Sequence, residues 1–167
     1  MRIRLAQMGD LQSLEALMNR SINELMSAVL NPAQVAASFE FMGLDTQLIK
    51  DQTYVVCMDG DQIAGCGGWS NRATLFGSDE TVGRDARMLD PKTEPARIRA
   101  MYTDPDFTRR GVGKLVLDAC EAAARDAGFR DAVLSATLAG EPFYLANGYR
   151  EDERQIETAS NLSLIHI

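Results

Sequence analysis

The sequence predicts one α+β domain, because strand-like and helix-like segments alternate along the chain. Two β-rich runs, residues 53–58 and 62–70, flank a turn at 59–61 and predict a hairpin. Another strand pattern at 97–103 leads through a short polar loop into an amphipathic helix that Gly128 ends. With 167 residues, 46% of them hydrophobic and 25% charged, the chain can bury the core of a single domain over residues 1–167.

The N-terminal quarter predicts one strand and two helices. Residues 3–6 alternate in polarity as a strand does. Asp10 is a suitable N-cap for the first helix, and Asn31 with Pro32 begins a second helix that Gly43 ends. The apolar residues of the first helix recur at helical spacing, and they are Leu11, Leu14, Leu17 and Met18.

Two features in the middle of the chain each allow two interpretations. Gly65, Gly67 and Gly68 in the return strand of the hairpin indicate either a bulged, twisted strand or room for a substrate. Residues 71–95 are polar and irregular, and they are longer than an ordinary connection. The mixed charges of this segment favour a solvated loop, and a lid over a substrate is the alternative.

The C-terminal part predicts a strand at 132–136, a short helix at 141–146 and a further strand from Tyr149 onward. The chain then stops abruptly. We expect the sequence after about residue 160 to be truncated or partly non-native, so His166 receives no functional role.

Composition narrows the classes of function. A net charge of −7 argues against nucleic-acid binding, and it suits either a cationic substrate or a solvated acidic surface. No apolar run reaches membrane-spanning length and no signal peptide is recognisable, so we expect a cytoplasmic protein. Cys57, Cys66 and Cys120 lack metal-ligand spacing and a histidine partner, which predicts buried reduced thiols and no metal site.

The junction between the strand at 97–103 and the long helix predicts an anion site. Arg109 and Arg110 precede Gly111 and Gly113 at the start of the helix. Exposed N–H groups and the helix dipole favour an anion there, and glycine lets a ligand approach the main chain. A phosphate-bearing ligand is therefore expected at this junction.

This junction, followed by the Phe-Tyr segment at 143–149, resembles the GNAT superfamily of acetyl-CoA-dependent N-acetyltransferases. The resemblance reaches to about Tyr149 and is strongest over 98–149. It implies a three-layer α/β/α fold with a mixed, mostly antiparallel sheet, a splayed central parallel strand pair and flanking helices. It also implies acetyl-CoA as cosubstrate, with the first two helices overhanging the acceptor site.

By this resemblance, backbone N–H groups of the loop bind the cofactor pyrophosphate, and the arginine and lysine side chains add positive charge. The preceding strand holds the pantetheine arm, and a main-chain N–H of Met101 or Tyr102 polarises the thioester carbonyl. The predicted cofactor-binding residues are Met101, Tyr102, Thr103, Arg109, Arg110, Gly111, Val112, Gly113, Lys114 and Thr137. Thr108 and Thr137 depart from the usual family residues, which shifts the expected contacts from side chains to the backbone.

Tyr144 is the predicted general acid, because it matches the family tyrosine. A phenol with a pKa of about 10 stays protonated at neutral pH and can donate to a departing thiolate. The alternative is a core aromatic residue. The general base stays open between Glu24, Glu40, Glu94 and a water relay.

The predicted function is direct transfer of an acetyl group from acetyl-CoA to a primary amine in a ternary complex. The alternatives are a non-catalytic CoA-binding sensor or interaction module, and an acyltransferase that uses another acyl-CoA. The acceptor is a small molecule or a peptide amine that the sequence does not identify. A homodimer is common in such proteins.

Overall fold

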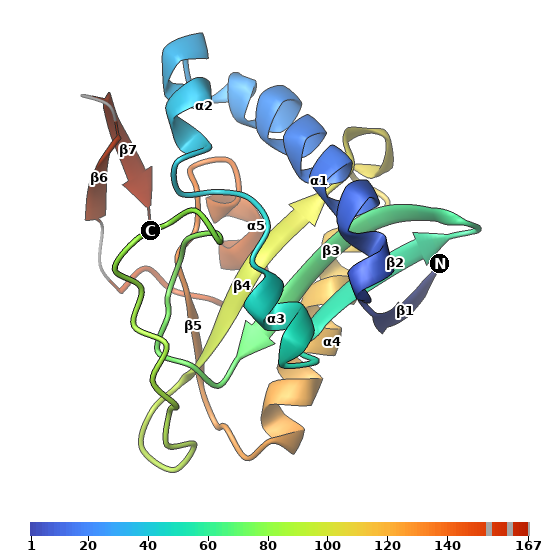
Figure 1. Cartoon of the computed structure of the whole chain (residues 1–167), viewed down its shortest axis with the longest axis vertical. Helices are drawn as coiled ribbons and strands as arrows, with labels where there is room; N and C mark the ends of the chain where they lie inside the picture. The colour runs from blue at the N-terminus through green and yellow to red at the C-terminus, as the bar shows by residue number, and fades with distance from the viewer. Residues whose placement is uncertain (153–154, 160–161, 167) are drawn as a thin grey trace.

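The computed structural model describes residues 1–152, 155–159 and 162–166, and Figure 1 shows their arrangement. Five strands form one sheet in chain order: β1 (Arg2–Leu5), β2 (Tyr54–Asp59), β3 (Gln62–Ser70), β4 (Ala96–Thr103) and β5 (Ala132–Leu134). The strands β1 to β4 are antiparallel neighbours, whereas β4 and β5 run parallel. The predicted α+β class and the mixed, mostly antiparallel sheet are confirmed.

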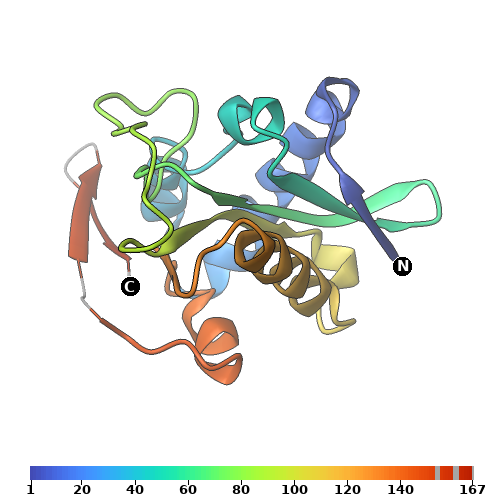
Figure 2. The same cartoon turned by 90° about the horizontal axis from the view of Figure 1, so that it is seen from below.

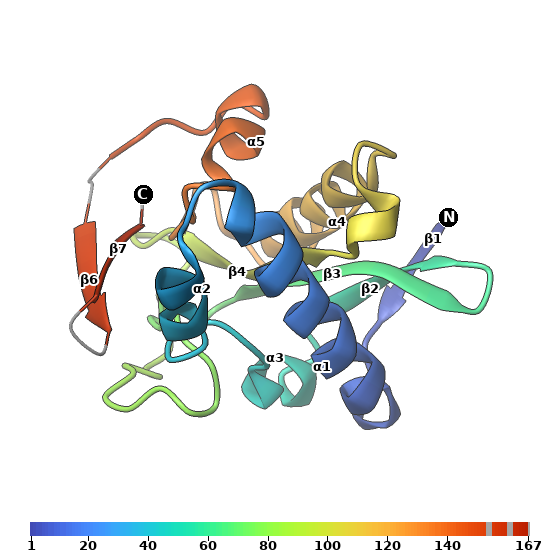
Figure 3. The same cartoon turned by 90° about the horizontal axis from the view of Figure 1, so that it is seen from above.

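Helices cover both faces of the sheet, which gives the three expected layers (Figure 2). One face carries α1 (Leu11–Arg20) and α3 (Thr46–Lys50), and the other carries α4 (Val112–Asp126) and α5 (Glu141–Ala146). The short helix α2 (Pro32–Ser38) lies between α1 and α3 in the chain, and Figure 3 shows it beyond the end of α1. No helix within the described ranges is both long and apolar enough to cross a membrane.

Local sequence signals place several helix ends where they were predicted. The Asn31 side chain accepts a hydrogen bond from the Gln34 N–H at 2.9 Å, and the Gln34 side chain accepts one from the Asn31 N–H at 3.0 Å. This reciprocal capping box begins α2 at Pro32. Gly128 follows α4 with a φ of 96°, as expected for glycine beyond a helix C-terminus.

Two local predictions are corrected, and one helix was not predicted. The Asp10 carboxylate does not cap α1; it accepts from the Gln7 N–H at 2.8 Å and pairs with the Arg4 guanidinium at 2.7 Å. The second helix ends at Ser38, before Gly43. The short helix α3 was not predicted, and the Asp45 side chain caps it by accepting from the Gln47 N–H at 3.1 Å.

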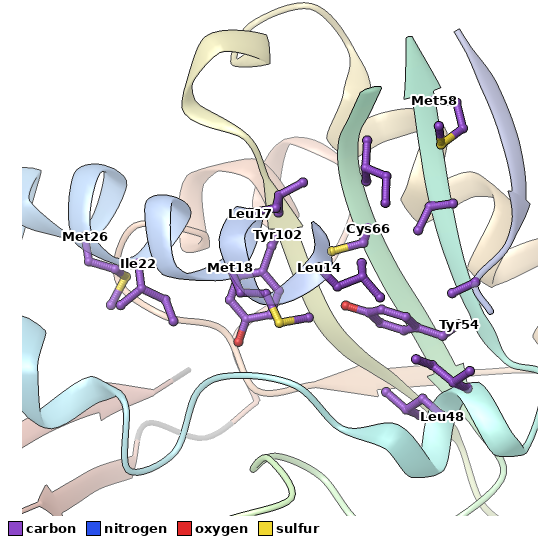
Figure 4. Close-up of a cluster of buried hydrophobic side chains, with 14 of the residues drawn as sticks. Leu14, Leu17, Met18, Ile22, Met26, Leu48, Tyr54, Met58, Cys66 and Tyr102 are labelled. Atoms are coloured by element: carbon purple, nitrogen blue, oxygen red, sulfur yellow. The ribbon is translucent and has the colours of Figure 1, made fainter. Parts of the chain in front are cut away.

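Two large apolar clusters, one on each face of the sheet, form most of the core, and a small third cluster surrounds Ala37. Because successive strand side chains point to opposite faces, Tyr54 and Val56 join the cluster beneath α1, whereas Cys57 joins the cluster beneath α4. Figure 4 shows the first cluster, where Leu14 and Met18 of α1 lie against Tyr54 and Cys66 of the sheet. All three cysteines are buried free thiols, as predicted.

The parallel strand pair is short and then separates. Ala96, Arg97 and Ile98 pair with Ala132, Val133 and Leu134, and the register stops there although β4 continues to Thr103. The predicted splay is therefore present. Its predicted central position is corrected, because β5 is the outermost strand of the five and the next two strands pair only with each other.

Those two strands, β6 (Gln155–Ala159) and β7 (Leu162–His166), form a separate antiparallel hairpin. The strand predicted from Tyr149 onward therefore begins only at Gln155. Residues 153–154, 160–161 and 167 lie outside the described residues, and the last three of them fall in or at the edge of the segment after about residue 160 that was predicted to be truncated or non-native.

The glycines of β3 serve close packing. A Cβ atom on Gly65 would lie 2.4 Å from Val112 Cγ1, and one on Gly67 would lie 2.3 Å from Met101 Sδ. A Cβ atom on Gly68 would lie 2.7 Å from the Tyr54 ring and 2.9 Å from the Thr53 carbonyl oxygen. The side chains of the core occupy this space, so the bulged strand is the interpretation that the structure supports.

We expect Gly68→Ala to lower the free energy of unfolding by about 1–3 kcal/mol, because the added methyl group meets a buried ring and a fixed backbone oxygen. Gly9→Ala is the matched control, since a Cβ there meets nothing within 4 Å and should change stability by less than about 0.5 kcal/mol. Urea denaturation monitored by circular dichroism measures both. Equal midpoints for Gly68→Ala and the unmodified protein would contradict the packing argument.

Candidate functional site

The loop between β4 and α4 is fixed by a buried carboxylate. Asp104 is only 4% exposed, and its side chain accepts from the Asp106 N–H at 2.9 Å, which caps the short 3-10 helix Pro105–Phe107. Arg20, the last residue of α1, pairs with Asp104 at 2.9 Å and with Asp106 at 3.1 Å. An ion pair from the opposite face of the sheet thus holds the start of the loop in one conformation.

The end of this loop, at the start of α4, has main-chain N–H groups without intrahelical partners. Arg109 and Gly111 have φ values of 61° and 82°, so the chain turns sharply before the helix begins. Leu115 makes the first bond of the helix, from its N–H to the Gly111 carbonyl at 3.0 Å. Within the described residues, no main-chain N–H from Arg109 to Lys114 donates to a backbone carbonyl. These groups can bind an anion.

The charged side chains of this loop differ in their freedom. The Arg110 guanidinium pairs with Asp59 at 3.1 Å and lies 4.7 Å above the centre of the Phe107 ring. Lys114 pairs with Asp118 one turn further along α4. The exposed Arg109 side chain has no hydrogen bond or ion pair within the described part of the chain. It is therefore the cation of this loop that is most available to a ligand.

Gly113 has a packing role in addition to the predicted one. A Cβ on Gly113 would lie 3.3 Å from the Phe143 ring of α5. Glycine therefore lets the N-terminal turn of α4 approach α5 closely. This contact brings the loop before α4 near the helix that carries Tyr144.

A bulge distorts β4 where it leaves β5. Cys66 pairs with Tyr102 and Gly68 pairs with Arg99, so Ala100 and Met101 of β4 face the single residue Gly67. Ala100 has a φ of 50°, which is unusual for a residue with a side chain. Its carbonyl accepts a hydrogen bond from the buried Tyr54 hydroxyl at 2.8 Å. The bulge is thus anchored from within the core.

A cavity of about 110 Å³ lies where the two strands diverge. Met101, Tyr102, Thr137 and Tyr144 line it, which brings together four of the residues predicted from the sequence. A larger hollow of about 550 Å³ runs along the outer side of β5 and also has Tyr144 in its wall. Thr103 does not line the cavity and pairs with Gly65 instead.

Some of the polar groups that line this cavity already have hydrogen-bond partners within the protein. The Thr137 hydroxyl accepts from the Gly140 N–H at 3.2 Å, at the turn that begins α5. The Tyr102 hydroxyl accepts from the Gly43 N–H at 2.9 Å. The Tyr144 ring packs edge-on against Tyr149, with the ring centres 5.8 Å apart. Desolvation raises the pKa of the Tyr144 phenol above its usual value, so its proton stays bound at neutral pH.

A family model described as an acetyltransferase (GNAT) domain matches residues 50–151, which include the loop, α4 and α5. The chain belongs to this family. The loop before α4 and the diverging strands β4 and β5 are therefore parts of a GNAT domain.

Solved structures share the fold of this GNAT domain at low sequence identity. A GCN5-related N-acetyltransferase from Rhodopseudomonas palustris is 17% identical with a TM-score of 0.71, covering 99% of this chain and 91% of its own. PaiA N-acetyltransferase from Thermoplasma acidophilum, in complex with coenzyme A, is 12% identical with a TM-score of 0.62, covering 99% and 96%. An N-acetyltransferase from Staphylococcus aureus Mu50 is 14% identical with a TM-score of 0.65, covering 99% and 93%. The search of curated protein sequences gave no match.

The candidates for the general base in this GNAT domain do not line the cavity. Glu94 pairs with Arg87 at 2.7 Å, and this contact lowers the pKa of its carboxyl to about 2. Glu24 pairs with Arg20 at 3.3 Å, and Glu40 is exposed. Among the described residues that line the cavity, none carries a carboxylate. Glu24, Glu40 and Glu94 therefore have no support from this geometry as a direct base.

Sequence reasoning missed a buried ion cluster beside the cavity. Arg99 and Asp45 are each 2% exposed and pair at 2.9 Å, and Arg84 from the long loop pairs with the same carboxylate at 2.8 Å. A second loop residue, Arg72, pairs with Asp51 at 2.6 Å. The sequence signal that could have revealed this cluster is Arg99 within an apolar strand, because a buried arginine needs a carboxylate partner. The loop is tied to the core of the GNAT domain by these pairs.

We expect the three cysteines of the GNAT domain to resist alkylation in the folded state. Burial raises the pKa of Cys66 and of Cys120 to about 12, so both remain thiols at pH 8. Cys57 is also fully buried, and desolvation raises its pKa. Mass spectrometry after iodoacetamide treatment should find no label on these residues before urea denaturation and all three labelled after it. Fast labelling of Cys66 or Cys120 in the folded protein would contradict this.

Proposed function

We propose that this GNAT domain transfers the acetyl group of acetyl-CoA to a primary amine in a ternary complex. The observation that carries the proposal is the cavity between β4 and β5, which has the β4 bulge and Tyr144 in its wall. The helix N-terminus beside it presents the N–H groups and the cation that a phosphate needs. The cavity suits the acyl thioester end of an acyl-CoA, and the N-terminus of α4 suits its pyrophosphate.

The cofactor would bind along the loop and the open side of β4. The N–H groups from Arg109 to Lys114 and the Arg109 guanidinium would bind the pyrophosphate. The side of β4 that has no strand partner after Ile98 would bond the pantetheine arm through main-chain groups of Met101, Tyr102 and Thr103. Structurally similar proteins from Thermoplasma acidophilum and Mycobacterium tuberculosis are in complex with CoA, which supports CoA as the ligand.

The reaction needs one bond formed and one broken. The amine nitrogen attacks the thioester carbon, a C–N bond forms, and the C–S bond breaks with its electron pair leaving on sulfur. A main-chain N–H of the β4 bulge, from Met101 or Tyr102, stabilises the negative charge on the carbonyl oxygen. Tyr144 donates its hydroxyl proton to the thiolate and regains one from solvent. Water removes the proton that the amine loses.

Two further assignments rest on this proposal, and a second candidate function stands beside it. The group transferred is acetyl, because the cavity of about 110 Å³ has little room for a longer acyl chain beside an acceptor. The buried reduced thiols suit a reducing compartment such as the cytoplasm. A non-catalytic CoA-binding module is the second candidate, favoured by the lack of a carboxylate among the described lining residues.

We expect Arg109→Ala to weaken acetyl-CoA binding about fivefold to tenfold, because an exposed charge-assisted contact to phosphate is lost. Arg110→Ala should weaken it less, since Arg110 is already paired with Asp59. Arg125→Ala, at the other end of α4, is the control and should leave the dissociation constant unchanged. Isothermal titration calorimetry measures all three. Absence of any acetyl-CoA or CoA binding by the unmodified protein would reject the proposed function.

We expect Tyr144→Phe to lower kcat about 100-fold, the contribution typical of a general acid, with little change in the dissociation constant of acetyl-CoA. Tyr149→Phe is the matched control, because its ring packs in the same cluster while its hydroxyl donates to Glu121 at 2.9 Å. A coupled assay for released thiol measures turnover. Unchanged kcat in Tyr144→Phe would remove Tyr144 from the acid role, and binding without turnover by any amine would favour the non-catalytic module.

A further inference from the structure

One wall of the cavity is apolar and comes from two segments that are distant in sequence. Phe41 and Met42 precede α3, and Leu75 and Phe76 belong to the long loop. The Phe41 and Phe76 rings meet edge to face, with their centres 6.4 Å apart. The Asp79 N–H donates to the Leu44 carbonyl at 2.9 Å, and this hydrogen bond joins the long loop to the segment before α3. We call these four residues the acceptor wall.

Arg99 fixes the loop half of the acceptor wall. Its guanidinium donates to the Thr74 carbonyl at 3.2 Å and to the Gly77 carbonyl at 2.9 Å, on either side of Leu75 and Phe76. The same group is paired with the buried Asp45 carboxylate. The two apolar side chains are therefore held in place before any ligand binds, and the charge of Arg99 is already compensated.

The charges around the cavity select among amines. Arg99 is the only charged side chain among the described residues that line it, and no described carboxylate or lysine does so. A second ammonium group on the acceptor would find no anion there and would face a guanidinium. A carboxylate on the acceptor would compete with Asp45 for a cation that the core requires. A hydrocarbon group meets neither penalty and buries apolar surface.

We propose that the acceptor is a small primary monoamine whose hydrocarbon substituent packs against the acceptor wall. This inference rests on the proposed acetyl transfer and adds the chemical class of the acceptor. The net charge of −7 is a property of the whole chain, whereas no described residue that lines the cavity carries a negative charge. The cavity volume of about 110 Å³ limits the substituent to a few carbon atoms or one ring.

The test compares n-butylamine, 1,4-diaminobutane and 4-aminobutanoate, which present a methyl, an ammonium and a carboxylate at the far end of similar chains. We expect kcat/KM per neutral amine to be on the order of 100-fold higher for butylamine than for either charged compound. Equal or faster acetylation of the diamine, the amino acid or a peptide with an N-terminal alanine overturns the acceptor class alone. Absence of thiol release with every amine overturns the acceptor class together with the proposed transfer.

Variants locate the preference in the acceptor wall. Phe76→Ala should lower kcat/KM for butylamine about tenfold, through lost apolar contact, and should leave the KM for acetyl-CoA unchanged. Val82→Ala is the control, because Val82 belongs to the same loop and is 95% exposed. An unchanged ratio of butylamine to diaminobutane turnover in both Phe76→Ala and Phe41→Ala would overturn the assignment of this wall.

Discussion

The separation of β4 from β5 is the constraint on which the rest of the site depends. Parallel strands normally continue side by side, and the bulge at Ala100 prevents this by inserting an extra residue with a φ of 50°. Such a conformation costs about 1–3 kcal/mol and persists only where its surroundings hold it. Tyr54 provides that support, because its ring is buried in the core and its hydroxyl holds the Ala100 carbonyl. The cavity and the unpaired side of β4 are consequences of this anchored bulge.

Buried electrostatics determine how the long loop contributes to the site. A connection of this length has little secondary structure, with one isolated bridge between Arg72 and Met88. Its order comes instead from arginines that reach buried carboxylates, with Arg84 and Arg99 sharing Asp45. Breaking a buried pair of this kind costs about 3–5 kcal/mol, so the cluster is a strong constraint on position. The sequence allowed two interpretations of this loop, a solvated loop or a lid over a substrate. The structure has features of both, because the outer side of the loop is polar and its inner side forms part of the cavity wall.

The sequence predicted features that depend on neighbours in the chain and missed those that depend on distant ones. Asn31, the turn at 59–61 and Gly128 act within a few residues, and the structure confirms them. Asp10 has the right residue type for a cap, but Arg4 competes for its carboxylate. The pairing of Arg99 with Asp45 joins residues 54 positions apart, and no local pattern identifies the partner. Motif resemblance supplied the loop and Tyr144, whereas the acceptor wall required the folded chain.

The acid role that we propose for Tyr144 depends on the environment that its phenol would share with the leaving thiolate. Desolvation raises the pKa of its phenol, which taken alone makes it a weaker acid. Desolvation also disfavours a thiolate, as it does at the buried Cys66 and Cys120, where it raises the pKa of the thiol. A CoA thiolate released beside Tyr144 would be destabilised in the same sense, so its pKa would rise together with that of the phenol. A partly desolvated phenol is therefore suited to protonate a thiolate that is desolvated in the same cavity, although it would be a poor acid toward a thiolate in water.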